Sequence, residues 1–208
     1  MPFLKESECT MRQSLIPQVL MFGALLLLSG CGVNNLPTLD EGVKAAWSQV
    51  QNQYQRRADL IPNLVATVKS YAAQERETLL AVTEARAKVG SMQVDPSLID
   101  DPARLQQFEQ AQSKLSGALS RLMVVVEKYP DLKSNQNFLA LQSQLEGTEN
   151  RISIARRDYI NSIAGYNTEL RTYPGKLWHG WLYPELTVRE DYYEATAAAA
   201  DQPPAVTF

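Results

Sequence analysis

The residues best suited to a covalent modification are Leu28-Ser29-Gly30-Cys31. They close an apolar run, Val19 to Leu28, which only Gly23 interrupts. Small residues fit the cleft of a signal peptidase that cuts immediately before a lipid-modified cysteine. The thiol of that cysteine accepts the diacylglyceryl group. Ten apolar residues are too few for a membrane span of about twenty, but they are typical of a signal peptide. We therefore expect residues 1–30 to be a lipoprotein signal peptide and Cys31 to be lipidated, with an uncleaved signal anchor as the alternative.

The same cysteine predicts where the protein resides. Palmitoyl and diacylglyceryl chains together exceed the two signals that stable membrane attachment requires. Gly32, and not an aspartate, follows Cys31. We expect a bacterial envelope lipoprotein, which in a Gram-negative cell would be sorted to the outer membrane and face the periplasm. Cys9 is the only other cysteine, so the processed chain would have no disulfide and no thiolate metal site.

The remaining chemistry-bearing residues do not form a catalytic pattern. His179 is the only histidine, whereas a di-metal bundle site needs Glu-x-x-His motifs on two helices and acid–base relays commonly use a histidine. We expect no enzymatic activity, no cofactor and no metal, and we expect His179 in a loop, bonded to backbone or solvent. The net charge of −3 argues against nucleic acid, which selects a basic surface.

A polar set is the first candidate interaction site. It comprises Arg56, Arg57, Asp59, Asn63, Glu149, Asn150, Arg151 and Arg156. Arg57 falls within an apolar stripe, where a cation is costly unless a carboxylate meets it. Glu149 is the expected partner. The set is either a network that fixes helix register or a groove that binds a partner peptide or a lipid headgroup, and the spacing leaves both open.

Aromatic residues near the C-terminus are the second candidate site. Trp178, Trp181 and Tyr183 lie in an irregular, Gly- and Pro-containing stretch. Such rings either cap one end of the fold or lie at a membrane interface or partner surface, where an amphipathic ring has an apolar and a wet side.

The elements that position these residues are helices. Apolar residues recur with 3-4 spacing over residues 39–89, 101–129 and 134–173, which predicts helices that each bury one stripe. Pro62 interrupts the first segment without shifting its phase, so either one kinked helix or two helices meeting near residues 59–62 are possible; we favour the kinked helix. Thr38 and Glu41 resemble a capping box. The pattern predicts an all-α, elongated antiparallel bundle of three to four long helices with coiled-coil-like packing.

The predicted organisation has four parts. Residues 1–30 are the signal peptide, 31–37 a lipidated tether, 38–174 the helical bundle, and 175–208 an aromatic loop with a C-terminal tail. Val206 and Phe208 alternate as apolar residues after Pro203-Pro204. We expect these last residues to dock on the bundle in extended form and to bury Phe208.

Several short motifs resemble the LemA family. They are Arg56-Arg57-Ala58-Asp59-Leu60-Ile61-Pro62-Asn63-Leu64-Val65, Val82-Thr83-Glu84-Ala85-Arg86, Tyr129-Pro130-Asp131-Leu132-Lys133, Asn135-Gln136-Asn137-Phe138, Thr148-Glu149-Asn150-Arg151-Ile152 and Pro204-Ala205-Val206-Thr207-Phe208. The resemblance covers about residues 47–208 and implies an exported helical bundle with an N-terminal membrane segment. Some members are linked to building membrane compartments. Many have an uncleaved transmembrane anchor, whereas this chain has a lipobox.

The resemblance and the composition together lead to two functional expectations. The first is a non-catalytic, membrane-anchored envelope lipoprotein that acts as a scaffold or interaction module in membrane organisation, with an envelope protein as its partner. The alternative is a carrier of lipid or of a small ligand, with a cavity between the helices.

Overall fold

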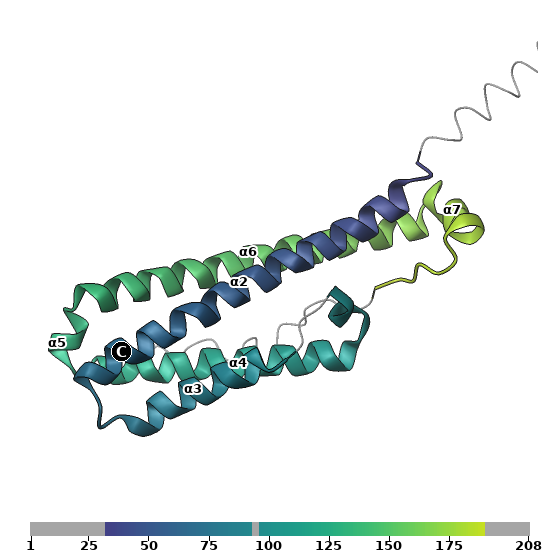
Figure 1. Cartoon of the computed structure of the whole chain (residues 1–208). Helices are drawn as coiled ribbons and strands as arrows, with labels where there is room; N and C mark the ends of the chain where they lie inside the picture. Colours follow the sequence, from purple (N-terminus) through teal and green to yellow (C-terminus); the bar gives the residue numbers. More distant parts are fainter. Residues whose placement is uncertain (1–31, 93–95, 190–208) are drawn as a thin grey trace, which may run out of the picture. The chain divides into compact units, whose positions relative to one another are not determined.

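The computed structural model describes residues 32–92 and 96–189 (Figure 1). These residues fall into two compact units. The terminal unit contains residues 32–40 and 166–188, and the bundle unit contains residues 41–92, 96–165 and 189. All regular structure in the described residues is helical, which confirms the predicted all-α helical bundle. Cys31 and Phe208 lie outside the described residues, so the lipidation and the docking of the tail stay predictions.

Helix α2 (Asn35–Tyr71) contains Pro62 within it. Of the two expected arrangements at Pro62, the helix that continues through the proline is therefore present, and no break occurs at residues 59–62. Ile61 and Leu64 on either side of the proline are both fully buried. Their burial stabilises the helix across a residue that cannot donate its backbone hydrogen bond.

The predicted segment 39–89 nevertheless consists of two helices, because α2 ends at Tyr71 and α3 (Arg76–Gly90) begins after a turn. Side chains stabilise this corner. The Tyr129 hydroxyl donates to Glu75 Oε1 (2.8 Å) and accepts from Gln74 Nε2 (3.0 Å). The 3-4 pattern continues through the turn because both helices bury their stripes in the same core. Glu75 is a polar residue at a stripe position of the 39–89 segment, as Arg57 is, so such a residue did not by itself distinguish a corner from a straight helix.

The second and third predicted helices are present with the expected starts. Helix α4 (Pro102–Val126) has Asp101 as its N-cap, and the Asp101 carboxylate accepts from the backbone N–H groups of Ala103 and Arg104 at 3.1 Å each. A short 3-10 helix, η1 (Pro96–Asp100), precedes it. The capping box expected at Thr38 is wrong, because α2 begins earlier and the Thr38 hydroxyl bonds to Asn34 O (2.7 Å) inside the first turns.

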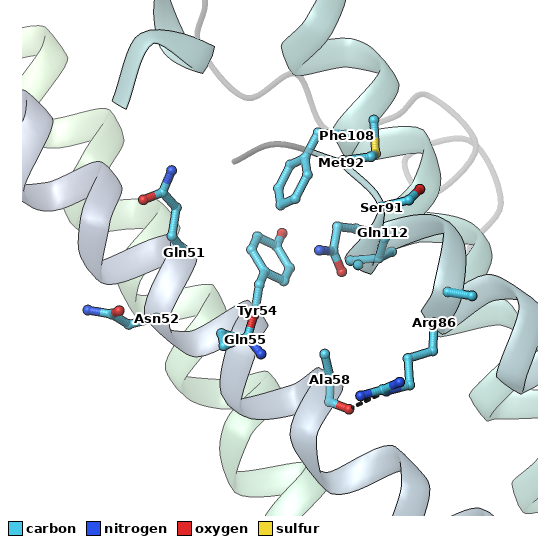
Figure 2. A pocket seen from close by; sticks show the side chains of 13 residues that line it. Gln51, Asn52, Tyr54, Gln55, Ala58, Arg86, Ser91, Met92, Phe108 and Gln112 are labelled. Atoms are coloured by element: carbon cyan, nitrogen blue, oxygen red, sulfur yellow. Dashed lines mark hydrogen bonds between the residues drawn. The ribbon is translucent and has the colours of Figure 1, made fainter. Parts of the chain in front are cut away.

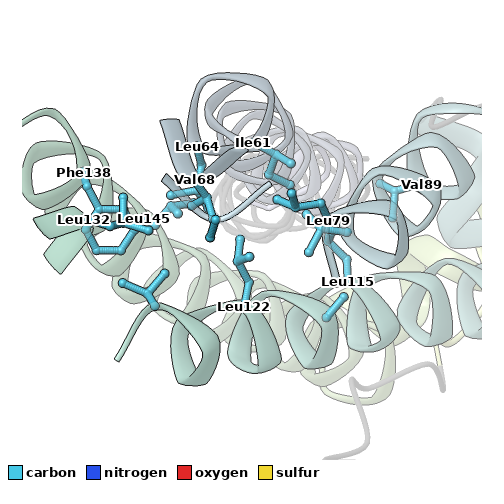
Figure 3. Close-up of a cluster of buried hydrophobic side chains, with 14 of the residues drawn as sticks. Ile61, Leu64, Val68, Leu79, Val89, Leu115, Leu122, Leu132, Phe138 and Leu145 are labelled. Atoms are coloured by element: carbon cyan, nitrogen blue, oxygen red, sulfur yellow. The ribbon is translucent and has the colours of Figure 1, made fainter. Parts of the chain in front are cut away.

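Helix α6 (Gln136–Arg171) completes the set of long helices, after the four-residue α5 (Pro130–Lys133). In the bundle unit, α2 lies beside α6, and α3 packs against α4 (Figure 1). Figure 3 shows the apolar side chains that meet between them. Leu64, Val68, Leu115, Leu122 and Leu132 are fully buried. Each such side chain contributes about 1.5–3 kcal/mol as an upper estimate, and this core positions the polar and aromatic residues of the bundle unit considered below.

The terminal unit contains helix α7 (Gly175–Leu182). We expected an irregular loop here, and that expectation is wrong for these eight residues. Gly175 and Gly180 reduce the intrinsic helix propensity, so the helix depends on contacts beyond its own sequence. The following segment supplies one of them, since His179 Nε2 lies 2.7 Å from Leu186 O. His179 thus bonds to backbone as expected, but from a helix.

Candidate functional site

Arg57 is a cation in the apolar stripe of α2, and its side chain is only 3% exposed. Its Nη1 donates to Glu149 Oε2 in α6 (2.8 Å) and to Ser116 Oγ in α4 (3.0 Å), and its Nη2 donates to Gln112 Oε1 in α4. We call these four residues the arginine cluster. Because each bond needs its helix in one register, the cluster fixes α2, α4 and α6 relative to one another within the bundle unit.

Aromatic rings adjoin the arginine cluster. The Tyr54 ring centroid lies 5.2 Å from Arg57 Cζ, within the range of a cation–π contact. Tyr54 meets Phe108 edge-on at 5.3 Å, and Phe108 meets Trp47 at 6.0 Å. Trp47 in turn lies 5.3 Å from Tyr159 of α6. The rings form a continuous line that links the same three helices as the cluster.

The cluster leaves two buried donors without a hydrogen-bond partner among the described residues. They are Arg57 Nε and Gln112 Nε2. A buried unpaired donor costs about 1–3 kcal/mol, which offsets part of what the Gln112 Oε1 bond to Arg57 contributes. Gln112 also borders the larger cleft of the bundle unit, although its side chain is buried.

The structure brings together only part of the predicted polar set. Arg57 pairs with Glu149, as expected. Asp59 accepts from Gln55 Nε2 (2.8 Å) on the same helix and is exposed. Arg156 is half-buried, and the remaining members are exposed, namely Arg56, Asn63, Asn150 and Arg151. Since the 3.6-residue turn places adjacent residues on different faces, neighbours of Arg57 and Glu149 in sequence do not join their cluster.

Sequence reasoning missed Gln112, Ser116 and Tyr54 as partners of Arg57. Gln112 had a detectable signal, because it is a polar residue at a stripe position of the 101–129 segment, as Arg57 is in α2. Ser116 and Tyr54 carried no such signal, because a serine beside a stripe and a tyrosine within one are ordinary in helical cores.

The larger cleft lies between α2, α3 and α4 and has a volume of about 820 Å³. Figure 2 shows Tyr54, Phe108, Met92 and Gln112 around it. We call it the Tyr54 cleft. Arg86 closes one end, since its Nε donates to the Ala58 carbonyl (2.9 Å). The full lining comprises Gln51, Asn52, Tyr54, Gln55, Ala58, Arg86, Ala87, Val89, Gly90, Ser91, Met92, Phe108 and Gln112. Amide and aromatic side chains therefore share its walls.

A smaller cleft of about 330 Å³ exposes the other members of the arginine cluster. Arg57, Ser116 and Glu149 line it together with apolar side chains that include Leu119, Met123 and Leu145. The Glu149 side chain is 56% exposed there. Water can therefore reach the carboxylate of the ion pair but hardly the guanidinium.

The predicted aromatic site lies in the terminal unit. Trp178 and Tyr183 are half-buried, whereas Trp181 is 77% exposed. Tyr183 closes α7, since its backbone N–H donates to Trp178 O (3.3 Å). Trp181 is therefore the ring that is exposed for a surface contact, and both expected roles of this site stay predictions.

Residues 32–92 and 96–189 offer neither a metal centre nor a membrane span. Within them, no group of three or more His, Cys, Asp or Glu side chains could hold a metal ion. No helix in the same residues is long and apolar enough to cross a membrane.

Comparison with known proteins decides the family. The family model described as LemA family matches residues 46–208, which include the arginine cluster and the Tyr54 cleft. The chain belongs to the LemA family. This confirms the resemblance that the short motifs indicated.

Individual relatives of this LemA-family chain are distant. Magnetosome protein MamQ 2 of Paramagnetospirillum magneticum is 26% identical over 196 residues, which cover 86% of this chain and 70% of the relative. Protein LemA of Metamycoplasma hominis is 24% identical over 140 residues, which cover 67% of this chain and 60% of the relative. Magnetosome protein MamQ of Magnetospirillum gryphiswaldense is 26% identical over 157 residues, which cover 68% of this chain and 58% of the relative.

Proposed function

We propose that this LemA-family chain is a non-catalytic envelope protein, attached to a membrane by a lipid on Cys31, that binds another envelope protein through the Tyr54 cleft. The observation that carries the proposal is the position of this cleft beside the arginine cluster. Hydrogen bonds of Arg57 to Ser116 and Gln112 hold α2 and α4 in register, and the bond of Arg86 to the Ala58 carbonyl joins the α3 wall to α2. A cleft with walls held in this way is preorganised, which lowers the entropic cost of binding.

The lining of the cleft favours a polypeptide as the bound partner. Four of its side chains are amides, namely Gln51, Asn52, Gln55 and Gln112. An amide can both donate and accept, which matches the alternating N–H and C=O groups of a peptide backbone. Tyr54, Phe108 and Met92 add aromatic and thioether surface, and these residue types are enriched at protein interfaces. A carrier of acyl chains would instead need a predominantly apolar cavity.

The expected setting is the surface of an envelope membrane. The lipobox that ends at Cys31 supports attachment by lipid. Two of the relatives are named magnetosome proteins, and by analogy we propose a role in organising an envelope membrane. In a Gram-negative cell the proposed location is the outer membrane, facing the periplasm.

Photocrosslinking in intact cells tests this function. A benzophenone amino acid replaces Asn52, an exposed residue of the Tyr54 cleft, and in a matched control it replaces Gln144, an exposed residue of α6. We expect position 52 to yield a discrete adduct with one envelope protein, identified by mass spectrometry, and position 144 not to yield it.

Other outcomes would redirect the proposal. If position 52 gives no protein adduct while native mass spectrometry finds one lipid per chain, the carrier function is supported instead. If the adduct forms with residues 190–208 of the same chain, the tail occupies the cleft and the partner must bind elsewhere.

A further inference from the structure

The first described residue, Gly32, lies close to the start of α7 in the terminal unit. A Cβ built on Gly32 would lie 3.5 Å from Pro174 Cγ and 4.0 Å from Trp178 Nε1. Its φ of +112° lies in the left-handed region, which side chains other than glycine rarely adopt. Gly32 directly follows Cys31, and consecutive Cα atoms are about 3.8 Å apart. The proposed lipid attachment site is therefore covalently next to a residue that lies close to α7.

Helix α7 is held firmly in the terminal unit. A Cβ on Gly175 would clash with the backbone carbonyl of Glu169, so only glycine permits this approach of α7 to the end of α6. The Lys176 N–H donates to Thr172 O (2.7 Å). The Tyr166 hydroxyl donates to Thr187 O (3.0 Å) and fixes the segment that follows α7. The orientation of the helix is thus determined within its unit.

One face of this helix is apolar and exposed. Leu177 and Trp181 lie four residues apart in α7, which places them in one row, and Tyr173 lies just before the helix. Tyr173 and Trp181 are each 77% exposed, and Leu177 and Leu182 are also exposed. Lys176 lies in the same turn as Leu177 and is exposed. We call Leu177 and Trp181 the α7 face, and Tyr173 and Leu182 are exposed at the two ends of the helix.

We propose that the α7 face lies on the surface of a phospholipid bilayer and buries Trp181 and Leu177 at the level of the headgroups. The inference rests on the proposed attachment of the chain to a membrane at residue 31, because that attachment brings Gly32, and with it α7, to the bilayer. The occupant of the face is therefore the membrane itself.

The chemistry of the face suits this occupant. Eight helical residues span about 12 Å, too little to cross the hydrocarbon core of about 30 Å, so α7 would lie in the interface plane as amphipathic helices do. Tryptophan and tyrosine concentrate at this depth of the membrane. The Lys176 ammonium can remain among anionic headgroups while its methylene chain lies along the apolar face.

Tryptophan quenching by brominated lipid tests the proposal on the full-length chain. Protein purified from the membrane fraction is reconstituted in vesicles of phosphatidylcholine and phosphatidylglycerol with or without brominated acyl chains. Trp181→Phe retains Trp47 and Trp178, of which Trp47 is fully buried. We expect bromine to quench the wild-type emission and the variant to lose more than half of that quenching.

A matched control uses the exposed Val124 of α4. Val124→Trp combined with Trp181→Phe restores the tryptophan count, and we expect it not to restore quenching. Equal quenching in the wild type and Trp181→Phe, or full recovery through Val124→Trp, would overturn the α7 assignment.

Mass spectrometry of the N-terminus on the same samples keeps the two proposals separate. A lipidated Cys31 without quenching at Trp181 would refute the α7 contact alone. An unmodified Cys31 with quenching at Trp181 would refute the lipid anchor and support the α7 contact.

Discussion

Arg57 and Glu149 form an ion pair of 2.8 Å in which only the cation is buried, with 3% of the arginine side chain exposed and 56% of the glutamate side chain. Because of this asymmetry, the loss of Glu149 and the loss of Arg57 have different consequences for stability. Removing Glu149 leaves a buried charge with neutral partners, whereas removing Arg57 leaves a carboxylate that water already reaches.

We expect Glu149→Ala to lower the free energy of unfolding by about 1–3 kcal/mol. This is less than the 3–5 kcal/mol typical of breaking a buried pair, because water in the smaller cleft can replace part of the carboxylate. Urea unfolding measures the change. The control is Glu146→Ala, an exposed residue of α6 whose carboxylate accepts from Gln142 of the same helix, which should stay within about 0.5 kcal/mol of wild type. A similarly small effect at Glu149 would show that the pair is not stabilising.

The second prediction concerns the amide that Arg57 bonds. Arg57→Leu removes the donor to Gln112 Oε1, and Gln112 Nε2 already has no hydrogen-bond partner in the described residues. We expect Arg57→Leu combined with Gln112→Leu to be more stable than Arg57→Leu alone by about 1–3 kcal/mol, the cost of a buried unpaired amide. A double-mutant cycle by thermal unfolding gives the coupling. Simple additivity of the two substitutions would mean that the residues do not interact.

The corner between α2 and α3 should respond to alkaline pH. The hydrogen bond of the Tyr129 hydroxyl to the Glu75 carboxylate, together with burial and the charge of Glu75, raises the pKa of Tyr129 above the ordinary 10.0. A group whose pKa is raised by folding contributes stability that is fully present below its unfolded pKa and is lost as pH rises through its folded pKa. The contribution of Tyr129 should therefore decline only above pH 10.0.

Urea unfolding of wild type and Tyr129→Phe from about pH 7 to about pH 11 measures this decline. We expect the wild type to be the more stable at neutral pH and the difference to shrink above pH 10.0. The two proteins differ only in the hydroxyl of residue 129, so the comparison isolates its contribution. Parallel curves would show that the Tyr129–Glu75 bond does not contribute.

Lipid attachment predicts a specific loss. We expect Cys31→Ser to abolish incorporation of an alkyne fatty acid and to leave the unprocessed precursor in the membrane fraction, because the thiol is the acceptor. Cys9→Ser is the matched control and should keep the label. Label retained in Cys31→Ser would exclude Cys31 as the acylation site.

The C-terminal prediction concerns residues outside the described part of the chain. If Phe208 is buried on the bundle, its side chain contributes about 1.5–3 kcal/mol. Removal of residues 204–208 should then lower the melting temperature, and Phe208→Ala alone should account for most of the change. An unchanged melt would indicate that the tail does not dock.

Local spacing in the sequence by itself determined much of this protein. The 3-4 recurrence of apolar residues predicted the helices because a helix must bury one stripe. Asp101-Pro102 located the start of α4, because a cap depends on residues adjacent in sequence. Arg57 could be paired with Glu149 since a cation in a stripe needs a nearby carboxylate.

The tertiary structure alone decided the turn after Tyr71, the partners Gln112 and Ser116, the walls of the Tyr54 cleft, and helix α7. The turn and the partners depend on residues distant in sequence, such as Tyr129, which bonds to Glu75 in the turn, and Gln112, which bonds to Arg57. Helix α7 depends on the close approach of Gly175 to the backbone of Glu169. Hydrophobic periodicity is the same whether a chain continues straight or turns back, because both arrangements bury the same stripe. Which polar residues meet across helices follows only from the register in which those stripes pack.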